Sequence, residues 1–301
     1  MHIKKGFIVA FLLNIVILTL YFQSDIVDYI NKYIYKDEII EQQSIVYNDY
    51  KSNFNYLYIS ETDKILPNNI EQLRELYYTV LNSGMSEYSF YCPDDYVNCF
   101  NDISSISNDS LFLGTLNNYV HPYNSYQYIA TNVYGSKNTI MIQKNYSDEM
   151  ISILNKKVEE IISENINDTM SDREKIRVIH DYIINHTKYD KTKGENSHLA
   201  YGALIDGSAI CGGYTDAMSI FLYRFNIPNF KISTEEHIWN VVYLDGNWYH
   251  LDLTWDDPVN EILDILSHNY FLITDEELSE KNDGEHNYNK DFYLELSQKS
   301  N

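Results

Sequence analysis

The sequence predicts a fold that mixes α-helices with β-strands, and two neighbouring segments of its C-terminal half carry this prediction. After Cys211, apolar and aromatic residues recur at helical spacing, at positions 214, 217, 218, 221, 222 and 225. Two runs rich in aromatic and β-branched residues, 238–244 and 248–254, then flank an Asp-Gly-Asn turn signal. We therefore expect a helix followed by a β-hairpin.

Cys211 lies at or before the first turn of this helix, which should end near Asn226 and Pro228. Unpaired backbone N–H groups and the positive end of the helix dipole favour an anion there, and so favour thiolate, the reactive form of cysteine. Gly212 and Gly213 place no side chains beside the sulfur, which would leave room for a substrate backbone. The alternative interpretation is a buried cysteine beside two glycines in a tight turn.

The hairpin brings a histidine close to an aspartate if its register is the expected one. If Leu244 and Asn247 close a two-residue turn, Trp239 lies opposite Asp252, and His237 is the diagonal neighbour of Asp252 on the same face. Diagonal neighbours have Cα atoms roughly 7 Å apart, within reach of an imidazole and a carboxylate. A turn one residue longer would send Asp252 to the opposite face, so the pairing depends on the register.

In this order, Cys211, His237 and Asp252 are the parts of a thiol nucleophile, its base and the residue that orients the base. A carboxylate on one ring nitrogen fixes the tautomer and stabilises the imidazolium. Three alternatives remain open: His237 is structural, Asp252 only bonds a nearby backbone N–H, or His250, on the same predicted face, is the base. The order of the three residues and their predicted elements favour the catalytic interpretation.

Four motifs carry a resemblance: Ala200-Tyr-Gly-Ala-Leu204, Ala209-Ile-Cys-Gly-Gly-Tyr214, His237-Ile-Trp-Asn240 and Trp248-Tyr-His-Leu-Asp252-Leu-Thr-Trp-Asp-Asp-Pro258. Together they resemble the bacterial transglutaminase-like superfamily, part of the wider papain-like group, over about residues 171–274. The resemblance implies an α+β fold in which Cys211 begins a helix packed on an antiparallel sheet. It also implies Cys211 as nucleophile, His237 as base and Asp252 as orienting residue.

That superfamily includes protein cross-linkers, peptidases, amidases, deamidases and members without activity, so the resemblance implies a mechanism more than a substrate. We expect acyl transfer or hydrolysis at amide bonds through a thioester, without a cofactor. The backbone N–H of Cys211 is the first candidate for binding the oxyanion, while Tyr201, Gly212, Trp239 and Asn240 are further candidates for the oxyanion site or cleft. The alternative function is a surface binding or scaffold protein that uses the fold without chemistry.

The composition limits the partners. Of the 301 residues, 44% are hydrophobic, enough for a sizeable core and for two domains or one with an elaboration. The formal net charge of −22 argues against a nucleic-acid partner, because phosphate binding needs a basic surface. No metal is predicted, since Asp256 and Asp257 offer fewer oxygen ligands than calcium needs. Nothing in the sequence indicates the oligomeric state.

Composition and periodicity, together with the extent of the resemblance, divide the chain into five expected segments. They are a signal anchor or transmembrane helix at 1–24, a membrane-proximal stalk or helix at 25–53, a small α/β domain of unassigned role at 54–167, the transglutaminase-like catalytic domain at 168–275 and a polar tail at 276–301.

Elements before the cysteine follow from the same signals. A capping box from Ser171 to Glu174 opens a helix that runs through Ile184. The other expected elements are strands at 54–59 and 87–92, a strand pair across 131–142, and helices at 69–81, 94–106 and 147–165.

The N-terminal segment determines the expected location. Lys4 and Lys5 precede an apolar run of about 17 residues, the layout of a charged n-region followed by an h-region. We expect a single-pass protein of the cell membrane whose catalytic domain acts outside on protein or cell-wall peptide, with secretion after signal cleavage as the alternative. Cys92 and Cys99 are expected to form a disulfide in such an oxidising compartment, or else to stay unpaired.

Overall fold

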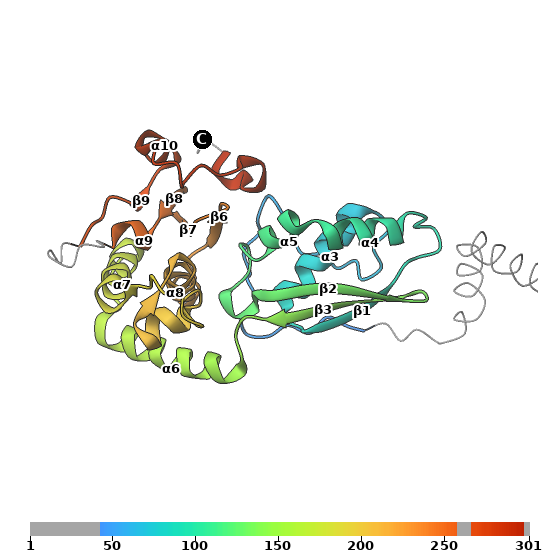
Figure 1. Cartoon of the computed structure of the whole chain (residues 1–301), viewed down its shortest axis with the longest axis horizontal. Helices are drawn as coiled ribbons and strands as arrows, with labels where there is room; N and C mark the ends of the chain where they lie inside the picture. Colours follow the sequence, from blue (N-terminus) through green and yellow to red (C-terminus); the bar gives the residue numbers. More distant parts are fainter. Residues whose placement is uncertain (1–42, 258–265, 298–301) are drawn as a thin grey trace, which may run out of the picture.

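The computed structural model describes residues 43–257 and 266–297 (Figure 1). The predicted anchor at 1–24 and the first part of the predicted stalk, 25–42, therefore lie outside the described residues. Within the described ranges, no helix combines the length and apolar character needed to cross a membrane. Figure 1 shows two lobes, one with the elements between residues 70 and 144 and the other with those from residue 148 onward.

The first lobe is an antiparallel sheet with helices packed against it (Figure 1). Its strands, in the spatial order β1-β3-β2, are β1 (Glu87–Tyr91), β2 (Tyr126–Tyr134) and β3 (Lys137–Lys144). Its helices are α3 (Ile70–Ser83), α4 (Cys99–Asn108), α5 (Ser110–Leu116) and the 3-10 helix η1 (Pro122–Asn124). Helix α5 was not expected from the sequence.

Cys92 and Cys99 form a disulfide, with Cα atoms 5.8 Å apart. Cys99 is the first residue of α4 and is fully buried, so the bridge ties the end of β1 to this helix. Helix α4 therefore begins five residues later than the range 94–106 predicts, because residues 93–98 form the loop that the bridge closes.

The strand expected at 54–59 is not formed, so this prediction is wrong. Tyr56 and Ile59 are buried, which explains the apolar pattern that suggested a strand. The backbone bonds to side chains of distant segments instead of to a neighbouring strand: the N–H of Leu57 donates to Glu295 Oε1 at 2.7 Å. Glu295 belongs to the C-terminal tail, so this segment connects the first lobe to the end of the chain.

The second lobe packs helices on a four-stranded antiparallel sheet in the order β6-β7-β8-β9. The strands are β6 (Asn229–Ser233), β7 (Ile238–Leu244), β8 (Asn247–Leu251) and β9 (Phe271–Ile273). The α-helices are α6 (Asp148–Asn165), α7 (Asp172–His186), α8 (Cys211–Arg224), α9 (Leu253–Asp256) and α10 (Asp275–Lys281). The shorter elements are the parallel pair β4 (Lys188–Tyr189) and β5 (Ser208–Ala209), the π-helix η2 (Gly202–Asp206), and the 3-10 helices η3 (Lys290–Phe292) and η4 (Leu294–Ser297). The expected α+β class is confirmed.

The β7–β8 hairpin has the register on which the site prediction depends. Leu244 pairs with Asn247, as expected for a two-residue turn. Asp245 and Gly246 both have positive φ angles, 52° and 86°, the backbone conformation that the favoured hairpin turns require. Continued by one residue beyond the Asn240–Leu251 pair, this register places Asp252 opposite Trp239.

Strand β8 ends at Leu251, three residues before the expected end at Thr254. Asp252 caps the short helix α9 instead, because its Oδ1 accepts the N–H groups of Thr254 and Trp255 at 2.9 and 3.2 Å. The aspartate is thus held at the junction of a strand and a helix.

Helix α8 is tied to the sheet through β7. The hydroxyl of Thr215 donates to the carbonyl of Ile238 at 3.0 Å, and the Asn240 amide donates to the Thr215 carbonyl at 3.0 Å and to Ser219 Oγ at 2.9 Å. These bonds fix the N-terminal half of α8, which begins with Cys211, against the strand that follows His237.

A buried ion pair joins β6 to α8. Lys231 Nζ lies 2.8 Å from Asp216 Oδ1, and the two side chains are only 6% and 8% exposed. The other carboxylate oxygen of Asp216 accepts the hydroxyl of Tyr146 at 2.7 Å, and this hydroxyl oxygen accepts the N–H of Ala200. The backbone N–H of Lys231 donates to Asn118 of the first lobe, so the pair lies where the lobes meet.

Replacing Asp216 with alanine is expected to lower the free energy of unfolding by about 3–5 kcal/mol, because it leaves the Lys231 ammonium buried without a partner. Urea denaturation followed by circular dichroism measures this change. Glu159→Ala is the control, since it removes an ion pair with Arg224 whose side chains are 55% and 56% exposed. Such a pair contributes less than about 1 kcal/mol. Equal losses in the two variants would contradict the prediction.

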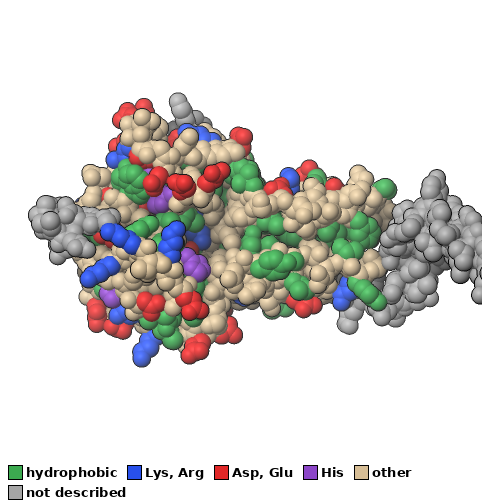
Figure 2. All heavy atoms as spheres, viewed as in Figure 1, with side chains coloured by type: hydrophobic (Ala, Val, Ile, Leu, Met, Phe, Trp, Pro, Cys, Tyr) green, Lys and Arg blue, Asp and Glu red, His purple; other side chains and the backbone are tan. Residues whose placement is uncertain are grey.

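The two lobes differ in their surfaces (Figure 2). In this view charged side chains are more numerous over the second lobe, whereas hydrophobic side chains gather over the first. Exposed large hydrophobic residues of the β2 and β3 strands are Tyr128, Val133, Tyr134 and Met141.

Candidate active site

Cys211 is the first residue of α8, and the extended residue Ile210 is the N-cap. A backbone N–H at this position has no partner inside the helix, and the helix dipole places positive partial charge beside the sulfur. The side chain is half-buried, and because Cys92 and Cys99 form the disulfide, Cys211 is the free thiol among the three cysteines. This is the partly exposed, electropositive setting of a reactive cysteine.

Gly212 and Gly213 allow a loop of the same chain to pack against the start of α8. A Cβ atom on Gly212 would lie 2.9 Å from the carbonyl oxygen of His198, and one on Gly213 would lie 2.6 Å from that of Ser197. The space that the sequence analysis assigned to a substrate backbone is therefore filled by this loop. The glycines are required by internal packing.

His237 and Asp252 are brought together as the register predicts. His237 Nε2 lies 2.5 Å from Asp252 Oδ2, and both side chains are buried. The other oxygen of Asp252 bonds the two backbone N–H groups of α9 described above. Asp252 therefore bonds both His237 and nearby backbone N–H groups, as the alternative interpretation expected. The backbone bonds hold the carboxylate in place for the imidazole.

The electrostatics favour an ion pair. Burial alone would lower the pKa of His237, but its hydrogen bonds with Asp252 and Cys211 outweigh burial and raise the pKa to about 10. Burial would raise the pKa of Asp252, but hydrogen bonds from His237 and His286 lower it to about 2. Since Asp252 occupies Nε2 of His237, Nδ1 is the ring nitrogen left for the thiol. At neutral pH, Asp252 is therefore a carboxylate and His237 an imidazolium.

His286, which the sequence analysis did not single out, is the second imidazole on Asp252. Its Nε2 lies 2.8 Å from Asp252 Oδ2, the same oxygen that contacts His237, and its Nδ1 lies 2.9 Å from Asp283 Oδ2. His286 follows Asp252 by 34 residues in the predicted polar tail, and no local pattern connects the two. Only the tertiary structure reveals this contact.

Aromatic side chains enclose the two histidines. Trp239 stacks on His237 with ring centroids 5.6 Å apart and meets His286 edge-on at 4.7 Å. Trp255 lies 6.5 Å from His237 and 5.2 Å from His286. These rings shield the hydrogen bonds from water, which strengthens them.

His250 is not positioned as a rival base. Its Nδ1 accepts the indole N–H of Trp239 at 3.0 Å, and its Nε2 faces Asp275 Oδ1 at 3.5 Å. Burial lowers the pKa of His250, and the hydrogen bond with Asp275 offsets only part of that change. Both ring nitrogens thus face groups other than Cys211.

The remaining cleft candidates differ in position. Both amide hydrogens of Asn240 bond to α8, so they are not free to bind an oxyanion. Tyr201 packs on the apolar core of the second lobe, and its oxyanion role stays a prediction. Tyr189 was missed: burial, the charge of Cys211 and the charge of Glu285 all raise its pKa, which places its hydroxyl within electrostatic reach of the thiol.

Among the residues that the structure describes, two groups of side chains have donor atoms close enough together to hold a metal ion: His180, Asp181 and His268, and His237, Asp252 and His286. Two ligand atoms on a tetrahedral zinc ion, each at about 2.0–2.1 Å from the metal, lie about 3.3 Å apart. The nitrogen-to-oxygen separations here are 2.8 and 2.9 Å in the first group and 2.5 and 2.8 Å in the second. These are hydrogen-bond distances, so we assign hydrogen bonds to both groups.

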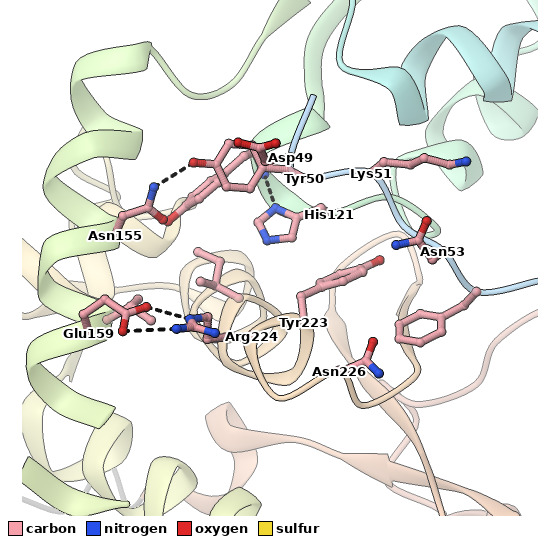
Figure 3. Close-up of a pocket in the computed structure, with 14 residues that line it drawn as sticks. Asp49, Tyr50, Lys51, Asn53, His121, Asn155, Glu159, Tyr223, Arg224 and Asn226 are labelled. Atoms are coloured by element: carbon pink, nitrogen blue, oxygen red, sulfur yellow. Dashed lines mark hydrogen bonds and ion pairs between the residues drawn. The ribbon is translucent and has the colours of Figure 1, made fainter. Parts of the chain in front are cut away.

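A separate pocket of about 310 Å³ lies between the lobes (Figure 3). Its lining includes Tyr50, His121 and Asn155, together with Tyr223 and Arg224 at the C-terminal end of α8. Cys211 is at the other end of the same helix, about 20 Å away at 1.5 Å per residue. This pocket is therefore distinct from the triad.

Comparison with known proteins supports the resemblance. Residues 159–253 match the transglutaminase-like superfamily, and the matched segment includes all three triad residues but not His286. Among solved structures, a crystal structure of a TGase aligns with 43% of this chain and 45% of its own, at 16% identity and a TM-score of 0.30. One named "putative cysteine protease" from Cytophaga hutchinsonii aligns with 44% of this chain and 63% of its own, at 14% identity and a TM-score of 0.29. Both alignments span less than two thirds of the other chain, and no curated protein matches.

Proposed function

We propose that this protein is a thiol enzyme that cleaves amide bonds of protein or cell-envelope peptide by acyl transfer through a thioester. One observation carries the proposal: His237 Nε2 lies 2.5 Å from the buried carboxylate of Asp252, and the same imidazole contacts Cys211 at the start of α8. These contacts support a role for Cys211 as nucleophile, His237 as base and Asp252 as orienting residue.

The reaction follows from these positions. His237 holds the proton of Cys211 in the resting ion pair, so the thiolate attacks the amide carbonyl carbon while backbone N–H groups at the start of α8 bind the oxyanion. The C–N bond then breaks, the imidazolium gives its proton to the departing amine, and the acyl group remains on sulfur as a thioester. His237 then takes a proton from the attacking acceptor, the acyl group leaves the sulfur, and the thiolate and imidazolium are restored.

The acceptor determines whether the enzyme hydrolyses or cross-links. Water gives hydrolysis, and a lysine amine gives an isopeptide bond. We take hydrolysis as the default because water is abundant and Cys211 is half-buried, not enclosed. Mixing the protein with a glutamine peptide and a labelled amine separates the two, because incorporation of the label indicates cross-linking and release of ammonia or cleaved peptide without incorporation indicates hydrolysis.

We also propose that the enzyme acts outside the cell, anchored by residues 1–24. The charged and apolar layout of that segment supports an anchor. The Cys92–Cys99 disulfide supports an oxidising compartment, where such bonds persist.

The pH dependence of alkylation tests the ion pair. In the full chain we expect iodoacetamide to modify Cys211 rapidly at pH 6, whereas an unperturbed thiol, with a pKa near 8.5, would be mostly unreactive there. His237→Ala should react about 100-fold more slowly at pH 6. Because the pKa of His237 is raised from 6.5 to about 10, the imidazolium is fully present below pH 6.5 and is lost as the pH rises through about 10. The wild-type advantage should therefore persist at neutral pH and disappear in alkali.

Intact mass measures the alkylation, and the disulfide-bonded Cys92 and Cys99 do not interfere. If wild type and His237→Ala react at the same rate at every pH, the ion pair does not exist. The protein would then be better described as a surface binding or scaffold protein that uses this fold without chemistry.

A further inference from the structure

We propose that His286 is a positioning residue that holds Asp252 in the orientation serving His237, so that the C-terminal tail completes the active site. This inference rests on the proposed function and extends it beyond the three residues of the triad. The observation behind it is that the imidazoles of His237 and His286 both bond to Oδ2 of Asp252.

The carboxylate of Asp252 is held by four donors. Oδ1 accepts the backbone N–H groups of Thr254 and Trp255, and Oδ2 accepts from Nε2 of both His237 and His286. The two backbone bonds leave Oδ2 able to pivot about Oδ1, because they contact only one of the two oxygens. Among the described residues, only the two imidazoles bond Oδ2, and the bond from His286 holds this oxygen independently of His237, the ring that it must orient.

His286 itself faces two carboxylates. Nε2 donates to Asp252, and Nδ1 lies 2.9 Å from Asp283 Oδ2, which also accepts the hydroxyl of Tyr270 at 2.8 Å. Each ring nitrogen therefore lies within hydrogen-bond distance of a carboxylate oxygen, so the ring of His286 bridges Asp252 and Asp283.

The ring of His286 is fixed in place by its neighbours. Tyr270 stacks on it with centroids 5.0 Å apart and planes at 20°, while Trp239 and Trp255 meet it at steep angles. A ring enclosed in this way and bonded at both nitrogens has one orientation. It can therefore transmit that orientation to Asp252.

After His286, the C-terminal tail packs against the rest of the protein. Tyr293 and Glu295 are buried, and the Tyr293 hydroxyl oxygen accepts the side-chain amide of Asn118 at 2.9 Å. Glu295 accepts the backbone N–H of Leu57 and the hydroxyl of Tyr119. The first lobe thus anchors the segment that supplies His286, which gives this lobe a part in assembling the site.

A cavity of about 300 Å³ opens beside this residue, and its lining includes His286, Asp283, Asp275 and Tyr288. A small molecule such as imidazole can therefore reach the position of the His286 ring if the ring is removed. This access makes chemical rescue a direct test of positioning.

The experiment compares full-length wild type, His286→Ala and His286→Gln by the rate of Cys211 alkylation with iodoacetamide at pH 6. We expect His286→Ala to react about 10- to 100-fold more slowly, the loss typical of removing a residue that orients a buried ligand or base. Added imidazole should restore most of the rate. His286→Gln, which keeps an N–H donor for Asp252 but loses the ring that also bonds Asp283, should lie between the two.

The matched control is His121→Gln, because His121 is 5% exposed and His286 is 7% exposed, and His121 lines the separate pocket of Figure 3. It should change the melting temperature without changing the alkylation rate. If His286→Ala slows alkylation no more than this control does, or if imidazole restores nothing, His286 is structural and the inference is overturned. A wild-type rate at pH 6 no faster than that of His237→Ala would instead overturn the proposed function itself.

Discussion

Replacing Cys211 with alanine is expected to abolish acyl transfer, with a loss of ~10⁴-fold or more in kcat, while the fold remains intact. In the proposed mechanism the thiolate forms the covalent bond with the substrate, and the other two cysteines are joined in the disulfide and cannot replace it. The side chain is half-buried at the start of a helix, where alanine is sterically acceptable, so the change removes reactivity with little loss of packing.

Turnover of a glutamine peptide and trapping of the thioester with hydroxylamine measure the first part of this prediction. Circular dichroism and the melting temperature measure the second. Cys211→Ser is a useful companion, because it keeps the size of the side chain while its hydroxyl is a much weaker nucleophile. Residual turnover near the wild-type level in both variants would mean that another residue attacks the substrate.

Asp252→Asn is expected to have the second largest effect, lowering both activity and stability. The carboxylate accepts four hydrogen bonds and donates none. An asparagine must place its NH₂ group on one side, either against the backbone N–H groups of α9 or against the two histidines, so donors face donors in both orientations. We expect kcat to fall about 10³- to 10⁴-fold, as when the orienting residue of a triad is neutralised.

The loss of stability expected for Asp252→Asn depends on pH. Removing one partner from a buried charged group costs about 3–5 kcal/mol. The pKa of Asp252 is lowered from 3.8 to about 2, so its ionised form stabilises the fold above pH 3.8 and this contribution is lost as the pH falls through about 2. Urea denaturation should therefore show a large difference between wild type and Asp252→Asn at pH 7 that shrinks below pH 4. A difference independent of pH would mean that the ionised carboxylate is not what stabilises the site.

Local signals predicted the part of the site that lies between residues 211 and 252. The helical stripe after Cys211 and the turn before Asn247 act over a few residues, and each was specific enough to place its element and the hairpin register. Once the register was known, the period of two in β-strands put His237 and Asp252 on one face. The motifs could then indicate a family because they combine these same local features.

Local signals were misleading where an apolar pattern had another cause. The residues at 54–59 suggested a strand, but Tyr56 and Ile59 are buried while the backbone N–H of Leu57 bonds to the side chain of Glu295. Gly212 and Gly213 suggested open space beside the sulfur, yet the loop at 197–198 fills it. A short stretch of sequence shows which residue is buried or lacks a side chain. It does not show which distant segment packs against that residue.

The sequence by itself therefore determined the helix that begins with Cys211 and the hairpin that aligns His237 with Asp252, and it predicted these three residues as nucleophile, base and orienting residue. Only the tertiary structure decided what surrounds them: the loop against α8, the tyrosine near the thiol and the second imidazole on Asp252. The physical reason is distance along the chain. Periodicity and turn chemistry reach a few residues, whereas His286 meets Asp252 across 34 residues, through a tail whose position depends on buried contacts with the first lobe.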